Sequence, residues 1–528
     1  MPKTVTLNGR DLTIPDVVAV ARHNVPVEIA PEARAEICRV RNYIEENWLS
    51  PEAPPVYGFN TGVGKLKDFN IDMDQKDIFQ NNIVMSHCGC VGEPAPEEVV
   101  RATMLVRLNA FCLGFSGLRI QVVDRLLEML NKGVHPVIPY QGSVGACGDL
   151  GPLAHMTSVL IGYEKAEAFY RGRRLSAPDA LQQAGIFPSV FQLKAKDCLA
   201  LINGTTMFTG LGALNCYDAL ELARTCDVAG AMSLEAVRGE TAAFDPRVHK
   251  ARLHKGQEIV ASNILKITSG STRVSEDARK IHLPHDIMHP SYQPRVQDLY
   301  SLRCIPQVHG AVRDNLQYAW ETIEREINAA TDNPLVFWDE SGEKLDFLSC
   351  GNFHGEPVAF AMDIVAISLA ELGNISERRS FFLCDPTLNY GLSPMLAGKP
   401  VGLNCGYPVI SCAAAALASE NKGLCFPASV DTIPTKSNQE DHVSILKNLE
   451  KIIGIEFLLA SHAISSTEEL LGEFKLGVRT AAVINRIRQD LRFVQEDHYM
   501  PGQSEPCILL TEKRELLVAV ESAIGNLA

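Results

Sequence analysis

The glycine-rich run 142–155 contains residue types whose spacing could support chemistry. It reads Gly-Ser-Val-Gly-Ala-Cys-Gly-Asp-Leu-Gly-Pro-Leu-Ala-His. Because glycine has no Cβ, a backbone this rich in glycine can fold onto itself. The amide nitrogen of Gly148 could then reach the carbonyl carbon of Ala146 and close a five-membered ring. Loss of the heteroatom of the Cys147 side chain would leave an exocyclic methylene, an electrophile made from the chain itself.

Two other interpretations of this run remain open. The run could be a turn that leads into a helix, with Asp149 near the helix start and Cys147 merely buried. Alternatively, Cys147 could be a thiolate nucleophile at a helix N-terminus, with His155 as its base. Eight positions along one helix correspond to roughly 12 Å. A direct pair of Cys147 and His155 within one helix is therefore not expected.

A second glycine-rich loop, residues 57–65, could hold the Tyr57 phenol at a cleft. It is not a phosphate-binding loop, because the glycine spacing before Lys65 is wrong and Leu66 follows where Ser or Thr is needed. Further short polar islands follow along the chain, and each of them alone says little. They comprise residues 86–87, 201–205, 295–303, 351–357 and 437–442.

Together and in this order, these islands resemble the histidine and aromatic amino-acid ammonia-lyases, from about residue 50 to residue 445, and most of all the histidine ammonia-lyases. Those enzymes usually read Ala-Ser-Gly in the triad and form methylidene-imidazolone (MIO), an electrophilic prosthetic group. The resemblance implies that Ala146, Cys147 and Gly148 form MIO here. It also implies elimination of ammonia from L-histidine, a small-molecule amino-acid substrate, to give urocanate in histidine catabolism.

The resemblance implies a role for each matched side chain. Tyr57 would remove the β-proton of the substrate, and a phenol with an ordinary pKa near 10 needs a positive or electrophilic neighbourhood to do so at neutral pH. Arg303 would clamp the substrate carboxylate with its planar fork. The other matched residues would line the prosthetic group and orient the amine (Tyr300, Asn203, Gln297), pack beside the ring (Phe353) or face the substrate side chain (His87, Glu440).

Glu440 indicates which substrate the pocket prefers. A carboxylate buried against a phenyl ring would lack a partner, which costs several kcal/mol, whereas an imidazole N–H would satisfy it. The pocket is therefore expected to favour histidine over phenylalanine.

The chain departs from the family pattern at three places. Cys147 replaces the usual serine, Leu299 replaces a usual proline, and residues 404–408 read Asn-Cys-Gly-Tyr-Pro instead of Asn-Ser-Gly-Phe-Met. A thiol leaves more readily than a hydroxyl, so MIO formation from Cys147 is chemically reasonable. The alternative is an ergothionase-like elimination of trimethylamine from a histidine betaine, which needs no MIO. Tyr57, Arg303 and Glu440 would serve that reaction equally well.

The sequence also leaves functions of other classes open. If the protein were a cysteine hydrolase, a thiol reagent would acylate Cys147 and abolish activity on esters or amides. A binding protein, or a catalytically dead or regulatory homologue, would bind imidazole acids without turnover.

Composition excludes several classes of protein. The chain has 528 residues, 46% of them hydrophobic and 21% charged, which is ordinary for a globular protein with a large core. A net charge of −14 argues against nonspecific nucleic-acid binding. The apolar run 410–418 is too short to span a membrane. Fifteen scattered cysteines, never spaced CxxC, and the lack of a secretory signal predict a cytoplasmic protein with free thiols.

No metal site is expected. Three histidines, His282, His285 and His289, lie close together in the sequence, but Pro284 and Pro290 break any helix that could align them.

Helical periodicity dominates the chain and predicts a mostly α fold. Apolar positions on one face of 122–130 precede Gly133, a typical C-cap residue. Long helical stretches are predicted near 310–330, 360–380, 408–424, 443–472 and 478–496, and small hairpins at 168–175 and 335–348. We expect an ammonia-lyase-type long-helix bundle at 201–528, which completes the active site. A smaller mixed N-terminal part, 1–200, would carry the tyrosine loop and the triad. The resemblance implies a homotetramer whose active sites mix residues from several subunits.

Overall fold

The computed structural model describes residues 3–49, 56–72, 74–142, 147–285, 295–430, 449–468, 470–472, 474–491 and 501–527. These residues form two compact units that interleave along the chain. Unit 1 comprises 1–217, 319–362 and 427–443, and unit 2 comprises 218–318, 363–426 and 444–528. The predicted division of the active-site motifs at residue 200 stays a prediction.

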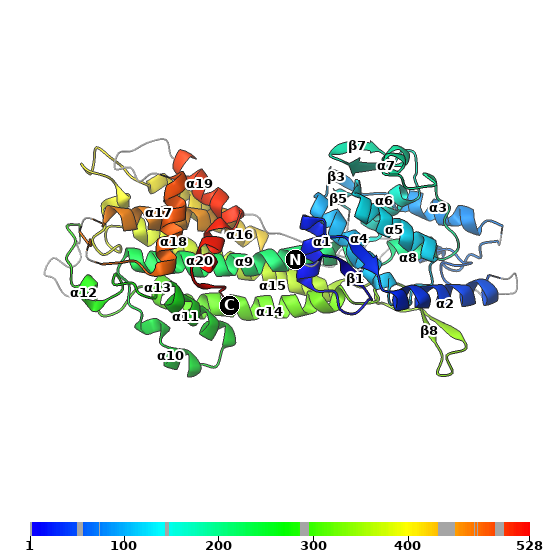
Figure 1. Ribbon diagram of the computed structural model, residues 1–528, viewed down its shortest axis with the longest axis horizontal. Helices are drawn as coiled ribbons and strands as arrows, with labels where there is room; N and C mark the ends of the chain where they lie inside the picture. The colour runs from blue at the N-terminus through cyan, green and yellow to red at the C-terminus, as the bar shows by residue number, and fades with distance from the viewer. Residues whose placement is uncertain are drawn as a thin grey trace. The chain divides into compact units, whose positions relative to one another are not determined.

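Unit 1 combines helices with small sheets (Figure 1). Its helices are α1 (Ile14–His23), α2 (Pro31–Asn47), α3 (Lys76–His87), α4 (Glu97–Phe111), α5 (Ile120–Lys132), α6 (Leu150–Leu160), α7 (Ala177–Gln183) and α8 (Asp197–Ile202). Its strands are β1 (Val5–Leu7), β2 (Val27–Ile29), β3 (Val91–Pro94), β4 (Val134–Pro136), β5 (Pro139–Gln141), β6 (Glu167–Tyr170), β7 (Arg173–Ser176), β8 (Leu335–Trp338) and β9 (Leu345–Leu348). Strands β1 and β2 pair in parallel, whereas β3–β5, β4–β6–β7 and β8–β9 are antiparallel.

The regular secondary structure of unit 2, within its described residues, consists of helices. It contains α10 (Pro246–Lys250), α11 (Lys255–Ile267), α12 (Glu276–Arg279), α13 (Tyr300–Arg303), α16 (Pro408–Leu424), α17 (Leu449–Ser466), α18 (Val478–Asp490), α19 (Pro501–Glu512) and α20 (Glu515–Ile524). Helix α17 packs on α19, and α18 packs on α20. Three long helices contribute residues to both units: α9 (Thr206–Ala236), α14 (Ile305–Glu326) and α15 (Glu356–Cys384).

Local signals explain several of these elements. Val122, Val123, Leu126 and Leu130 are buried on one face of α5, and Gly133 ends the helix in the left-handed conformation, as the sequence predicts. The two predicted hairpins form as β6–β7 and β8–β9. The prediction of a mostly α protein with small β elements is confirmed.

Three helices of unit 1 determine where the chemically interesting residues lie. Helix α6 packs against both α3 and α8, and α3 also contacts α8. The triad residues precede α6, His87 ends α3, and Asn203 ends α8. The packing of these helices therefore brings three separate sequence islands together.

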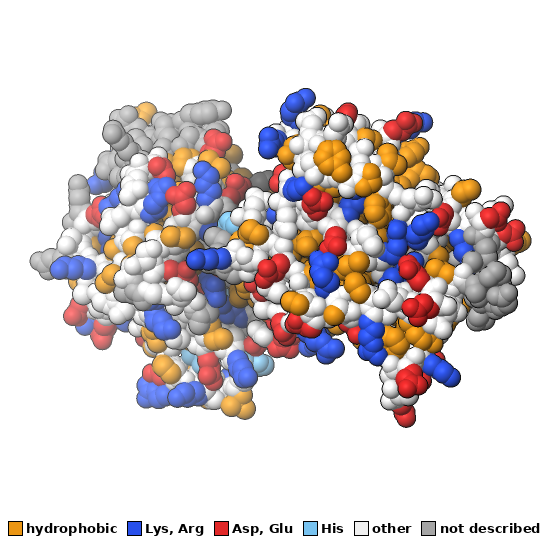
Figure 2. All heavy atoms as spheres, turned by 45° about the vertical axis from the view of Figure 1, so that its right-hand side comes forward, with side chains coloured by type: hydrophobic (Ala, Val, Ile, Leu, Met, Phe, Trp, Pro, Cys, Tyr) orange, Lys and Arg blue, Asp and Glu red, His pale blue; other side chains and the backbone are white. Residues whose placement is uncertain are grey.

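The distribution of surface charge and the apolar length of the helices are relevant to binding of nucleic acid and of a membrane. Basic and acidic side chains are interspersed on the face drawn in Figure 2. Among the described residues, α15 alone has the length and composition to cross a membrane, and half of its most apolar stretch is buried inside the protein.

Candidate active site

A cavity of about 800 Å³ in unit 1 brings together five of the predicted site residues. They are Tyr57, His87, Cys147, Asn203 and Phe353. Much of the remaining lining is apolar and includes Phe69, Ile71, Phe79, Ile83, Leu199 and Ile202. A cavity of this size that combines an apolar wall with a few polar groups is typical of a small-molecule site.

The tyrosine loop is anchored in the hydrophobic core. Phe59 is buried with Val40 and Ile44 of α2, and its ring meets Phe347 edge-on at a centroid distance of 4.7 Å. The hydroxyl oxygen of Tyr57 accepts a hydrogen bond from the Gly64 backbone N–H at 3.0 Å. A donor fixed in this position stabilises negative charge that develops on the phenol oxygen. The loop thus presents a held phenol to the cavity.

Cys147 lines the cavity although it is only 2% exposed. Its sulfur makes a long contact of 3.9 Å with the carbonyl oxygen of Gly204. Ala146 lies outside the described residues, whereas Cys147 and Gly148 lie within them. The Nε2 of His155 is engaged elsewhere, because it accepts the backbone N–H of Cys90 at 3.2 Å.

Asp149 follows the triad and precedes α6, but its side chain caps the start of α9. It stands at the N-cap of α6 without bonding that helix through its side chain. Its carboxylate instead accepts the backbone N–H groups of Met207 and Phe208 at 2.5 and 3.4 Å, at the start of α9. Burial raises the pKa of this carboxyl to about 7, although the two N–H donors and the charge of Arg107 act in the opposite direction.

This pKa predicts a pH-dependent effect of Asp149→Asn on stability. Between about pH 4 and pH 7, the folded protein holds a proton that the unfolded chain releases, so the contribution of Asp149 to stability is lost as the pH rises through 7. Asparagine can still accept the two N–H bonds but does not titrate. We expect the melting temperature of the variant, relative to the wild type, to rise between about pH 5 and pH 8.

Thermal unfolding at several pH values checks this expectation. Asp339→Asn is a suitable control, because the pKa of that exposed carboxyl is lowered and the group stays ionised over the same range. A melting-temperature difference for Asp149→Asn that is independent of pH would contradict the expectation.

Asn203 ends α8 and carries a polar atom with no partner. Its side chain lines the cavity, and its Oδ1 is buried without a hydrogen bond among the described residues. Buried polar atoms in native proteins are almost always satisfied. The carboxamide of Asn203 is therefore suited to a ligand or a prosthetic group.

His87 is oriented by its own helix. Its Nδ1 lies 2.8 Å from the carbonyl oxygen of Ile83. A carbonyl only accepts, so Nδ1 carries the hydrogen and Nε2 is the acceptor of the neutral ring. Phe353 reaches the same cavity from the loop that precedes α15.

Three further predicted site residues, all of them described, do not line this cavity. Gln297, Tyr300 and Arg303 belong to unit 2, and Tyr300 is 72% exposed. The Arg303 guanidinium stacks on the Tyr300 ring at 4.4 Å, and its Nε is buried without a hydrogen-bond partner among the described residues. Glu440 lies outside the described residues.

Several residues of the cavity wall were not predicted from the sequence. Asn333 and Cys350 line it, and Asn333 Oδ1 accepts the backbone N–H of Cys350 at 2.8 Å. Beside them, the buried Lys196 Nζ pairs with Asp332 at 2.8 Å. A lone cysteine and an Asn-Pro pair are common in loops, so no local signal marked these residues.

The departures at 299 and 404–408 lie in unit 2. Leu299 is the N-cap residue of α13. The buried hydroxyl of Tyr407 lies 2.8 Å from Nδ1 of His462 on α17. The phenylalanine usual at position 407 could not make this hydrogen bond.

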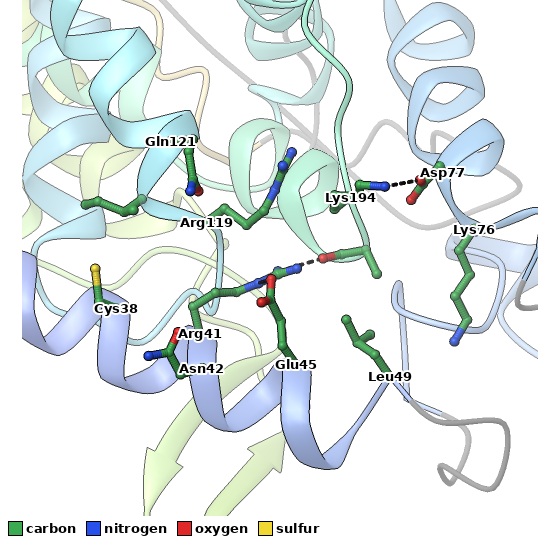
Figure 3. A pocket seen from close by; sticks show the side chains of 12 residues that line it. Cys38, Arg41, Asn42, Glu45, Leu49, Lys76, Asp77, Arg119, Gln121 and Lys194 are labelled. Carbon is green, nitrogen blue, oxygen red and sulfur yellow. Dashed lines mark hydrogen bonds and ion pairs between the residues drawn. The ribbon is translucent and has the colours of Figure 1, made fainter.

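A second cavity of unit 1, of about 490 Å³, lies beside α2 and the start of α5 (Figure 3). Arg41 donates to Glu45 at 2.8 Å, and Lys194 donates to Asp77 at 2.6 Å. The charges of Arg41 and Lys194 are thus compensated by the protein, and none of the predicted site residues in the described ranges lines this cavity. The larger cavity is the candidate active site.

Metal ligands are not grouped within the described residues. No three His, Cys, Asp or Glu side chains there are placed to hold a metal ion. His289, the third histidine of the sequence cluster, lies outside those residues.

Comparison with known proteins identifies relatives over the whole chain. The sequence profile of the aromatic amino acid lyases matches residues 12–489. Histidine ammonia-lyase of Alkaliphilus metalliredigens is 42% identical over 536 residues, which cover 99% of this chain and 100% of the relative. The crystal structure of histidine ammonia-lyase from Trypanosoma cruzi matches with a TM-score of 0.84 at 35% identity, covering 99% of this chain and 96% of that one. The predicted ammonia-lyase fold is confirmed.

A solved structure with a different named activity is also similar. The ergothioneine-degrading ergothionase of Treponema denticola matches with a TM-score of 0.86 at 27% identity, covering 97% of this chain and 99% of that one. The fold alone therefore does not separate these two activities.

Proposed function

The chain belongs to the aromatic amino acid lyase family, and from that premise we propose that it eliminates ammonia from L-histidine to give urocanate. The observation that carries the proposal is a relative named histidine ammonia-lyase that is 42% identical over essentially its full length. The cavity supports it, because Tyr57, Cys147 and Asn203 line one site. At 27%, the identity to ergothionase is much lower.

The described residues fit an MIO group formed from Ala146, Cys147 and Gly148. Cys147 lines the cavity, and the orphaned Oδ1 of Asn203 lines the same cavity. To form the group, the Gly148 nitrogen bonds to the Ala146 carbonyl carbon and one water leaves. The Cys147 Cα then loses its proton as the Cβ–Sγ bond breaks, which releases hydrogen sulfide. An MIO group held here would supply an electrophile that makes the substrate amine a better leaving group.

Four other predicted side chains of the cavity then have tasks in the proposed reaction. Tyr57 accepts the β-proton, with the Gly64 N–H stabilising the charge on its oxygen. Asn203 orients the amine, Phe353 packs beside the ring, and His87 faces the imidazole.

We further propose that a homotetramer completes the site. Gln297, Tyr300 and Arg303 have roles that the family resemblance assigns, yet they belong to unit 2 and not to the wall of the cavity. The exposed ring of Tyr300 and the unpartnered Nε of Arg303 suit residues that act on a site in the assembled protein. Light scattering combined with chromatography is expected to give four copies.

The substrate assignment is tested with the purified protein and two substrates. L-Histidine should yield urocanate and ammonia, whereas the betaine of histidine should yield little trimethylamine. The alternative is the ergothionase-like reaction. The observation that favours it is Cys147, because a family member that no longer forms MIO would also lack the usual serine. Turnover of the betaine without turnover of histidine would establish the alternative.

Glu440→Gln is expected to lower activity on histidine and to raise, in relative terms, any trace activity on phenylalanine. The reason is that a neutral amide pairs less strongly with the imidazole N–H and costs less to bury against a phenyl ring than a carboxylate does. Assays of both substrates on both proteins measure the ratio. Glu340→Gln, in the exposed turn of the β8–β9 hairpin, is the control. An unchanged ratio for Glu440→Gln would remove this residue from the specificity argument.

A further inference from the structure

Arg107 is a fully buried arginine of α4 that no sequence motif singles out. Burying a guanidinium costs free energy unless its charge and its N–H groups are compensated. Asp149 and Asp332 attract its charge through space, but Nε and Nη1 have no hydrogen-bond partner among the described residues. A nonpolar side chain would fill the same space at lower cost, so the position calls for a specific task.

The hydrogen bonds of Arg107 hold the end of α8. Its Nη2 donates to the carbonyl oxygen of Ala200 and, at 2.7 Å, to that of Asn203. The last carbonyl groups of a helix lack intrahelical partners, and a cation is favourable beside them. The guanidinium thus ties α4 to Asn203, the residue at which α8 ends.

The turn after α8 packs directly on the same guanidinium. Gly204 has a φ of +153°, and a Cβ at this position would lie 2.4 Å from Nη1 of Arg107 and 3.0 Å from the carbonyl oxygen of Thr331. The sulfur of Cys147 contacts the Gly204 carbonyl oxygen. Arg107 therefore holds the two-residue turn formed by Asn203 and Gly204, and Cys147 lies beside it.

We propose that Arg107 is a positioning residue of the active site, which fixes this turn so that the Asn203 carboxamide faces the cavity that Cys147 lines. The inference rests on the proposed function, because the task of Asn203 in orienting the amine comes from it. A lysine would keep the charge but would lose the planar fork that reaches the Ala200 and Asn203 carbonyls while packing on Gly204. Arg107 acts through Asn203 and does not touch the substrate.

The test is a double-mutant cycle of Arg107→Met and Asn203→Ala. Arg107→Met should lower kcat by about 100-fold, because a misplacement of about 1 Å can cost that much. KM should stay within about threefold, since the proposed carboxylate clamp is untouched. The double variant should match Asn203→Ala within about twofold, because the arginine has nothing left to position. Arg107→Lys should recover part of kcat.

Arg101→Met is the matched control. Arg101 is another buried arginine of α4, and it donates to the carbonyl oxygens of Val20 and Leu130, neither of which lines the cavity. Thermal unfolding should show comparable losses of stability for Arg101→Met and Arg107→Met. Only the Arg107 variant should lose kcat. The mass of the peptide that spans 142–155 should be the same in Arg107→Met as in the wild type.

Three results would overturn the inference. Multiplicative losses in the double variant would show that Arg107 does not act through Asn203. An equal loss of kcat in Arg101→Met would reduce its role to stability. A peptide mass altered only in Arg107→Met would assign Arg107 to formation of the prosthetic group instead. The cycle uses histidine or its betaine, whichever the wild type converts, and a wild type that converts neither contradicts the proposed function and this inference with it.

Discussion

Cys147→Ala is expected to abolish turnover of histidine, whereas Cys147→Ser should retain it. An ammonium group leaves poorly and the β-proton of histidine is weakly acidic, so elimination of ammonia needs the electrophile that Cys147 would supply. The serine variant restores the residue usual in the family, whose hydroxyl can also leave. The loss for alanine should be at least about a thousandfold, or about 4 kcal/mol of transition-state stabilisation.

Two measurements on the unreacted protein accompany the kinetics. The peptide that spans 142–155 should be lighter by one water and one hydrogen sulfide. Titration of the unfolded chain should find one thiol fewer than its fifteen cysteines. Cys350→Ala is the control, because Cys350 lines the same cavity but should leave the mass change intact. An unmodified peptide, from protein that converts a histidine betaine but not histidine, would overturn the ammonia-lyase proposal.

Arg303→Ala should lower kcat/KM on histidine more than Arg303→Lys does. Lysine keeps a point charge but loses the bidentate fork. Loss of charge-assisted hydrogen bonds in a dry site suggests roughly 2–5 kcal/mol for the alanine variant, by analogy with buried interfacial charge pairs. The unpartnered Nε and the stacking on Tyr300 support a guanidinium held ready for a carboxylate.

Steady-state kinetics of both variants decide this prediction. A substrate analogue that lacks the carboxylate, such as histamine, provides the control, because its weak binding should not depend on Arg303. Wild-type kcat/KM in both variants would show that Arg303 is not the carboxylate clamp.

The elements with strong local patterns could be predicted from the sequence. The apolar face of α5 and its terminal Gly133 show directly in the periodicity, and the two hairpins show in short alternating runs around turn residues. Five of the residues that line the cavity were also predicted as site residues, but through the family resemblance. Residue types and spacing alone left Cys147 open to three interpretations.

Long-range contacts could not be predicted. Asp149 stands at the N-cap of α6, near a helix start as expected, but the sequence does not show that its carboxylate caps α9, which begins almost sixty positions further along the chain. Arg107 looks like any charged residue on a helix until α8 places its carbonyl groups over the guanidinium. The hydrogen-bond partners of Asp149 and Arg107 are determined by how α3, α6 and α8 pack, and local sequence patterns do not predict that packing.

The anchoring of the tyrosine loop bears on where this protein tolerates engineering. Phe59, two residues after Tyr57, shares its core cluster with β8 and β9, and its ring packs edge-on against Phe347 of β9. The turn of this hairpin is exposed and far from Tyr57 in the sequence, so it looks like a convenient place for a tag or an inserted domain. If an insertion displaced β9, the displacement would pass through the contact of Phe347 with Phe59 to the phenol of Tyr57. Fusion partners are better attached elsewhere.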